Sequence, residues 1–103
     1  MIWRRALNFR RQRRTSPLPT ISAFYGILIQ MFYADHAPPH FHAQYAEHEA
    51  LINIATLELI EGGMPRRALA LVLEWAQEHR SELMEDWDLC ARLQTPRKIA
   101  PLP

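Results

Sequence analysis

Three of the five histidines lie within seven positions of one another, around a pair of prolines. The stretch spans residues 35–42 and reads DHAPPHFH. A histidine side chain titrates near pH 6.5, so imidazoles at neutral pH can accept and donate protons. His40 and His42 alternate with apolar residues, and in an extended strand both side chains project from one face. We therefore predict a histidine-centred functional site at Asp35, His36, His40 and His42.

Three interpretations of this site remain open on the sequence alone. The one that we favour is metal-free: His40 and His42 transfer protons, while Asp35 or His36 orients one of them or stabilises developing charge. The second is a divalent metal such as zinc, held by His40 and His42 at about 2.0–2.1 Å with His36, or Asp35, as the third ligand. The third is structural hydrogen bonding between loop and sheet. No His-Glu-x-x-His motif is present to strengthen the metal interpretation, so no cofactor is favoured, and a divalent metal such as zinc stays the alternative.

Two arginines form a second candidate feature. Arg66 and Arg67 follow Pro65, a residue suited to the first position of a helix. The free N–H groups at a helix N-terminus favour anions. We therefore predict that both arginines bind phosphate or carboxylate; the alternative is that they are solvated or paired with Glu61. If the helix begins near the histidine strand, the two features together indicate a phosphate-containing substrate such as RNA.

The hydropathy pattern that must position these residues is that of an α+β domain. Apolar stretches at 20–23, 27–33, 40–45, 51–54 and 57–60 predict a small, mostly antiparallel sheet of about four strands. Apolar residues on both faces of 27–33 predict a central strand covered on both sides. Apolar residues then recur at helical spacing to about residue 93. They predict one long C-terminal helix packed on the sheet, with a kink near Ser81.

Charge divides the chain into an arm and a body. Residues 1–17 carry six of the twelve basic residues, and no acid precedes Asp35. From residue 18 onward, six basic residues face eleven acids, a net charge of −5. We predict a disordered basic arm over 1–17, a single α+β domain over 18–95 and an extended tail over 96–103. For the arm, the alternatives are a nucleic-acid-binding segment and an organelle transit peptide.

The composition excludes some classes of protein. Cys90 is the only cysteine, so neither an internal disulfide framework nor a cysteine-based zinc finger can form. No apolar run reaches the roughly 18–20 residues that a membrane span needs. We therefore expect a cytoplasmic protein without a membrane partner.

From Leu18 onward the chain resembles the bacterial family called domain of unknown function 4160. The resemblance rests on 19–22 (PTIS), 24–27 (FYGI), 35–42 (DHAPPHFH), 49–52 (EALI), 57–58 (LE), 65–69 (PRRAL), 74–75 (EW) and 79–80 (HR). Family members typically begin Met-Pro-Thr-Ile-Ser, and Leu18 stands where the methionine is expected. We therefore expect that translation starts naturally at residue 18, which N-terminal sequencing of the native protein would test.

This resemblance implies a protein encoded beside a small partner of the type called domain of unknown function 2442. Such pairs look like type II toxin–antitoxin modules, with this family as the toxin. We therefore expect a toxin component acting on RNA or a nucleotide, in the manner of a metal-independent ribonuclease, with an antitoxin-like partner and a possible homodimer. The alternatives are a non-catalytic protein-binding or regulatory module and a metal-dependent hydrolase. The candidate residues are Asp35, His36, His40, His42, Arg66 and Arg67.

Overall fold

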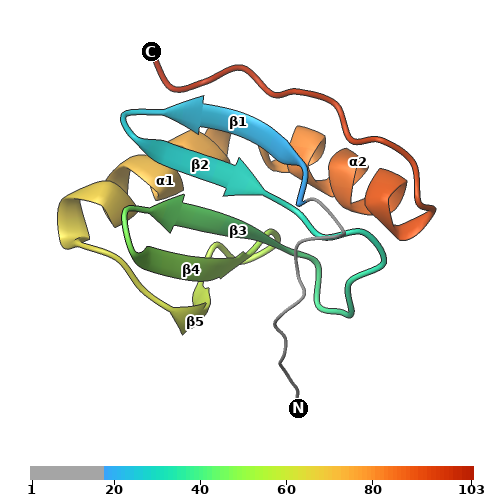
Figure 1. The fold of residues 1–103 in the computed structure, drawn as a ribbon, viewed down its shortest axis with the longest axis horizontal. Coiled ribbons are helices and arrows are strands. Elements are labelled where there is room, and N and C mark those ends of the chain that lie inside the picture. Colours follow the sequence, from blue (N-terminus) through green and yellow to red (C-terminus); the bar gives the residue numbers. More distant parts are fainter. Residues whose placement is uncertain (1–17) are drawn as a thin grey trace.

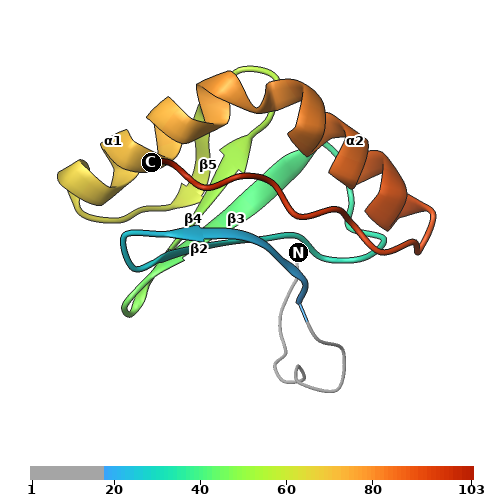
Figure 2. The same ribbon diagram turned by 90° about the horizontal axis from the view of Figure 1, so that it is seen from above.

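The computed structural model describes residues 18–103, and the predictions for residues 1–17 lie outside the described residues. A five-stranded sheet forms one layer and two helices cover one of its faces, as Figures 1 and 2 show. This is the predicted α+β class. The elements are β1 (Thr20–Phe24), β2 (Ile27–Gln30), β3 (His40–Tyr45), β4 (His48–Asn53), β5 (Leu59–Gly62), α1 (Arg66–Glu78) and α2 (Arg80–Ala91).

The sheet is an antiparallel meander in which each strand pairs with its neighbour in sequence. Five strands are present where about four were expected, because each of the five apolar stretches contributes a strand of its own. Ala46, with φ of +53°, closes β3 to β4 in a two-residue turn, so Glu49 pairs with Gln44 inside the sheet. Leu57, with φ of +63°, lies in a left-handed turn and is excluded from β5.

The helical segment is also different from the prediction of one long helix. His79 leaves the helical conformation, with φ of −125° and ψ of 23°, and separates α1 from α2 two residues before the expected kink at Ser81. The His79 side chain contacts Glu82 in the first turn of α2, where an acidic side chain also favours the helix dipole. Neither helix described in residues 18–103 has the length and apolar character that a bilayer span requires.

The core lies between the sheet and the helices. Trp75 of α1 is fully buried and contacts the rings of Phe24 and Phe41. Phe41 points to this core, so its strand neighbours His40 and His42 belong to the opposite face. In residues 18–103 both helices pack against the core side of the sheet, and Trp87 of α2 also reaches the His40 ring at the start of β3. Leu28 of β2 is 39% exposed on the face opposite the core. The expectation that the strand over 27–33 is covered on both sides is therefore wrong.

The chain beyond α2 runs back along the free edge of β1, and Figure 1 shows this course. The Ile99 N–H donates to the Ile21 carbonyl at 2.8 Å. The Trp75 Nε1–H donates to the Ala100 carbonyl at 2.8 Å. The first bond occupies the Ile21 carbonyl of β1, a group that an open sheet edge would expose, and the second ties the tail to α1.

Candidate functional site

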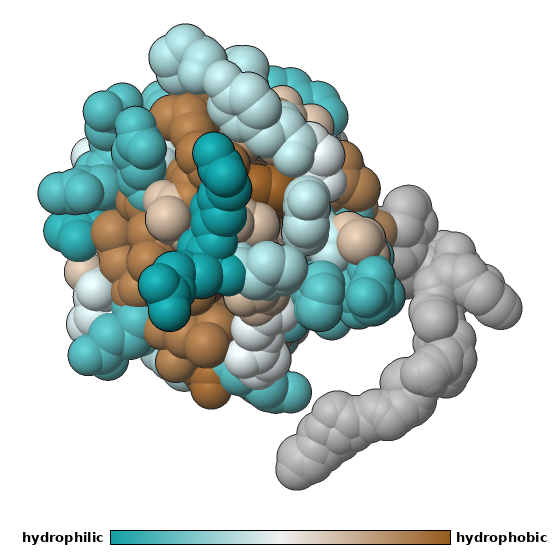
Figure 3. Space-filling model, turned by 90° about the vertical axis from the view of Figure 1, so that its left-hand side faces the viewer, coloured by the Kyte–Doolittle hydropathy of each residue, from teal (hydrophilic) through white to brown (hydrophobic). Residues whose placement is uncertain are grey.

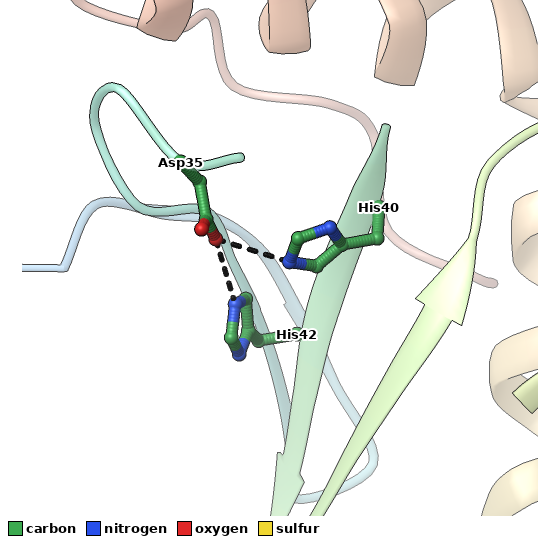
Figure 4. A group of neighbouring side chains, drawn as sticks. All are labelled: Asp35, His40 and His42. Atoms are coloured by element: carbon green, nitrogen blue, oxygen red, sulfur yellow. Dashed lines mark ion pairs between the residues drawn. The ribbon is translucent and has the colours of Figure 1, made fainter. Parts of the chain in front are cut away.

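Strand β3 and the loop before it provide the cluster that the sequence indicated. His40 and His42 both project from the face of β3 opposite the core, because a single residue, Phe41, separates them. The Asp35 carboxylate reaches both rings from the loop, as Figure 4 shows. Its Oδ2 lies 3.0 Å from His40 Nε2 and 3.6 Å from His42 Nε2. One carboxylate oxygen and two imidazole nitrogens thus meet at one point.

The other ring nitrogen of each histidine has its own acceptor. His40 Nδ1 lies 2.8 Å from the Pro38 carbonyl oxygen, within the proline-stiffened loop. His42 Nδ1 lies 3.1 Å from Glu49 Oε2 on β4. The strands predicted over 40–45 and 51–54 leave Glu49 outside the sheet, so Glu49 was not among the predicted site residues. A two-residue hairpin turn is the signal that would have brought Glu49 onto the sheet beside His42.

The two imidazoles are nearly buried. His40 is 4% exposed and His42 is 5% exposed. Trp87 of α2 covers the His40 ring at 5.2 Å between centroids, and Phe32 packs edge-on against the His42 ring at 4.7 Å. Backbone bonds also hold the loop, since the Ala34 N–H donates to the Cys90 carbonyl at 3.1 Å. The rings are therefore held in place before any ligand arrives.

In this cluster, burial and the contacts between charged groups shift the pKa values in opposite directions. Burial alone would raise the pKa of Asp35, but the contacts with His40 and His42 outweigh it and hold that pKa well below its usual range. Burial alone would lower the pKa of His42, but the flanking Asp35 and Glu49 outweigh it and raise that pKa. The contact with His42 lowers the pKa of Glu49 against the opposing effect of its own burial.

One predicted member does not join the cluster. The His36 side chain is 90% exposed, and its Nδ1 lies 4.0 Å from Asp35 Oδ1. The His36 backbone N–H donates to the same Asp35 oxygen at 2.8 Å, a local bond that turns the Asp35 side chain back over its own loop. The ligand set His36, His40 and His42 is therefore not assembled. Of the two residues considered as the third group, Asp35 lies beside both rings and His36 does not.

The arginines lie at the other end of β3. Arg67 lines a pocket of about 290 Å³ together with Tyr25, Ile27, Tyr45, Pro65, Ala68 and Leu71. Figure 3 views the molecule from this end, where apolar surface is crossed by hydrophilic side chains. Tyr45 is the last residue of β3 and His40 is the first, so their Cα atoms are about 16 Å apart at the usual rise per residue. The structure therefore does not bring Arg66 and Arg67 to the histidines.

The fold and the site define a small α+β protein with a nearly buried carboxylate–histidine cluster on the sheet face opposite the core. The chain belongs to the family described as Domain of unknown function (DUF4160), whose family model matches residues 26–88. The matched range contains Asp35, His40, His42 and Glu49, and it confirms the resemblance seen in the sequence. No curated protein and no solved structure matches the chain.

Proposed function

We propose that this chain is the toxin component of a bacterial type II toxin–antitoxin pair, and that Asp35, His40 and His42 form its reactive centre. The observation that carries the proposal is the meeting of a carboxylate oxygen and two nearly buried imidazoles at one point. Burying ionisable groups costs free energy unless they are paired. Clusters of this kind gather at functional sites more often than elsewhere.

The chemistry proposed is cleavage of a phosphodiester or phosphoanhydride bond. An attacking hydroxyl or water must lose a proton as its oxygen bonds to phosphorus, and the leaving oxygen must gain one. Imidazoles can move these protons directly, or a metal ion that they hold can lower the pKa of the attacking group. Positioning and charge stabilisation supply the rest of the acceleration. The cluster has groups for both tasks.

RNA fits the layout better than a single nucleotide does. The histidines and Arg67 lie near opposite ends of β3, with about 16 Å between His40 and Tyr45 at the Cα atoms. A polymer would span that distance and present one phosphate to Arg66 and Arg67 while another lies at the cluster. The net charge of −5 over residues 18–103 favours a basic partner, which the proposal takes to be a small antitoxin-like protein of the domain of unknown function 2442 type.

Growth arrest on induced expression in a bacterium tests this proposal. The full chain is compared with His40→Ala plus His42→Ala, and with the matched control His36→Ala plus His48→Ala, which removes two histidines outside the cluster. Circular dichroism checks that all three proteins fold. We expect arrest by the wild type and the control, and growth with the cluster variant. A wild type that never slows growth, or a folded cluster variant that arrests it fully, contradicts the proposal.

A second candidate function is a non-catalytic binding module. The observation that favours it is the exposure of large apolar side chains next to the cluster, with Leu28 39% and Phe32 43% exposed. In that case arrest, where it occurs, persists when the histidines are replaced and is lost on Leu28→Ser plus Phe32→Ser. The same growth assay therefore separates the two functions.

A further inference from the structure

We propose that Asp35, His40 and His42 bind one divalent transition-metal ion of the zinc class through Oδ2 and the two Nε2 atoms. The inference deepens the proposed function, on which its catalytic meaning rests, and it changes the metal-free site favoured by the sequence. The three side chains place their ligand atoms within 4.8 Å of one another. Carboxylate and imidazole are the usual ligands of such ions.

The hydrogen bonds of the two Nδ1 atoms determine the tautomer of each neutral histidine. The Pro38 carbonyl can only accept a hydrogen bond, so His40 Nδ1, at 2.8 Å, must carry a proton. The Glu49 carboxylate likewise accepts from His42 Nδ1 at 3.1 Å. In each neutral imidazole the lone pair is therefore on Nε2, the nitrogen that faces Asp35. Both histidines are oriented as metal ligands are.

With both histidines neutral, no positive charge lies among the three ligand atoms. Two Nε2 lone pairs and a carboxylate oxygen repel one another unless a proton or a cation lies among them. A proton on each ring would not satisfy the group, because His42 Nε2 is buried without a hydrogen-bond partner and lies 3.6 Å from Asp35 Oδ2. One divalent ion contacts all three atoms at once. It therefore accounts for the buried His42 nitrogen, which as an N–H group would lie 3.6 Å from Asp35 Oδ2, beyond hydrogen-bond distance.

The distances from Asp35 Oδ2 to the two Nε2 atoms are close to those between two ligands of one ion. Two ligand atoms bonded at about 2.05 Å to one tetrahedral ion lie about 3.3 Å apart. The separations from Asp35 Oδ2, 3.0 Å to His40 Nε2 and 3.6 Å to His42 Nε2, lie on either side of that value. The third separation, between the two Nε2 atoms, is within 4.8 Å, so small adjustments of the three side chains would let them meet one ion. Three protein ligands leave a fourth position for water or substrate, as in catalytic zinc sites.

The groups around the two histidines are those usually found around metal-bound histidines. Metal-bound histidines almost always donate their other N–H to a carbonyl or a carboxylate, and here Pro38 and Glu49 are those acceptors. The Asp35 side chain keeps 16% of its surface exposed and that of Glu49 keeps 52%, so the carboxylates lie toward solvent and give an ion a way in. The site is thus oriented, shielded and open on one side.

Zinc titration of the full chain, made without a histidine tag and stripped with a chelator, tests the inference by calorimetry. We expect one Zn²⁺ per chain with micromolar or tighter affinity in the wild type and in His36→Ala plus His48→Ala. Asp35→Asn, His40→Gln and His42→Gln should each weaken binding more than the roughly 10–100-fold typical of second-shell losses. The site is refuted if the wild type binds no stoichiometric zinc, or if the control loses as much affinity as the cluster variants.

A second measurement covers variants that do not fold. Cobalt(II) added to the wild type should give the intense visible bands of a four-coordinate site, and Zn²⁺ should displace it and raise the melting temperature. A weak octahedral spectrum together with an unchanged melting temperature overturns the inference. Metal binding and growth arrest are independent readouts. Zinc bound without toxicity sinks the proposed function alone, whereas histidine-dependent toxicity without zinc binding sinks the metal site alone.

Discussion

Glu49 holds the His42 ring from the neighbouring strand, with Oε2 at 3.1 Å from Nδ1. Glu49 pairs with Gln44 in the β3–β4 register and reaches diagonally to His42, which lies two residues before Gln44 on β3. This contact holds the proton of neutral His42 on Nδ1. The lone pair is therefore on Nε2, the nitrogen that faces Asp35. A residue on β4 thus positions a group on β3 without itself lying at the point where the three ligand atoms meet.

Glu49→Gln is expected to weaken zinc binding about 10–100-fold while one ion per chain is still bound, because the amide orients His42 less strongly than a carboxylate does. Glu47→Gln is the matched control, since the Glu47 side chain is 83% exposed and its carboxylate faces His48 rather than the cluster. Calorimetry on both variants measures the difference. Equal affinities for the two would show that Glu49 has no positioning role.

Gly62→Ala is expected to lower the free energy of unfolding by at least about 2 kcal/mol, because Gly62 has φ of +76° and an added Cβ would lie 2.1 Å from the Glu49 carbonyl oxygen. Gly63→Ala is the control, since a Cβ there meets nothing within 4 Å. Denaturant unfolding of both variants measures the difference. Similar stabilities would contradict the close approach of β5 to β4 at Glu49.

Asp86 anchors the chain that follows α2. Its Oδ1 accepts the Arg97 backbone N–H at 2.8 Å, while its Oδ2 is buried without a partner. Asp86→Ala is expected to cost about 1–3 kcal/mol, because the Arg97 N–H loses its acceptor. Asp86→Asn keeps an acceptor and should be at least as stable as the wild type at neutral pH. Chemical unfolding of the three proteins gives the ranking, and an Asn variant as unstable as the Ala variant would overturn it.

The same carboxyl predicts a pH dependence of stability. Burial raises the pKa of Asp86 above its ordinary value of 3.8, so the folded state keeps this proton to higher pH than the unfolded state does. Its stabilising contribution is complete below 3.8 and is lost as the pH rises through the folded-state pKa. The stability of the wild type relative to Asp86→Asn should therefore fall over this range. Parallel pH profiles for the two proteins would contradict the assignment.

Cys90 is expected to resist thiol reagents in the folded protein. Its side chain is buried, and burial raises the pKa of the thiol, so little reactive thiolate is present at neutral pH. An aromatic disulfide reagent should react at the rate at which the protein opens, and at once in denaturant. Rapid reaction under native conditions would show that the end of α2, whose Cys90 carbonyl holds Ala34 in the loop, is not packed as described.

The local pattern around β3 was sufficient to predict which way its side chains point. Alternation along a strand has a period of two, so Phe41 entering the core requires His40 and His42 on the other face. The start of α1 after Pro65 followed equally from local chemistry. The break at His79 did not, because the apolar spacing continues across it and the change lies in one residue's backbone angles.

The sequence by itself determined the α+β class, the family and the histidine strand, because residue type and period act over a few neighbouring positions. Only the tertiary structure decided between Asp35 and His36 as the loop residue that reaches the rings, and the choice is Asp35. The same structure brought Glu49 of the neighbouring strand to His42. It also placed Arg67 far from His40. These relations depend on turn lengths, strand register and the sign of φ at single residues, which fix distances between segments that the local pattern does not encode.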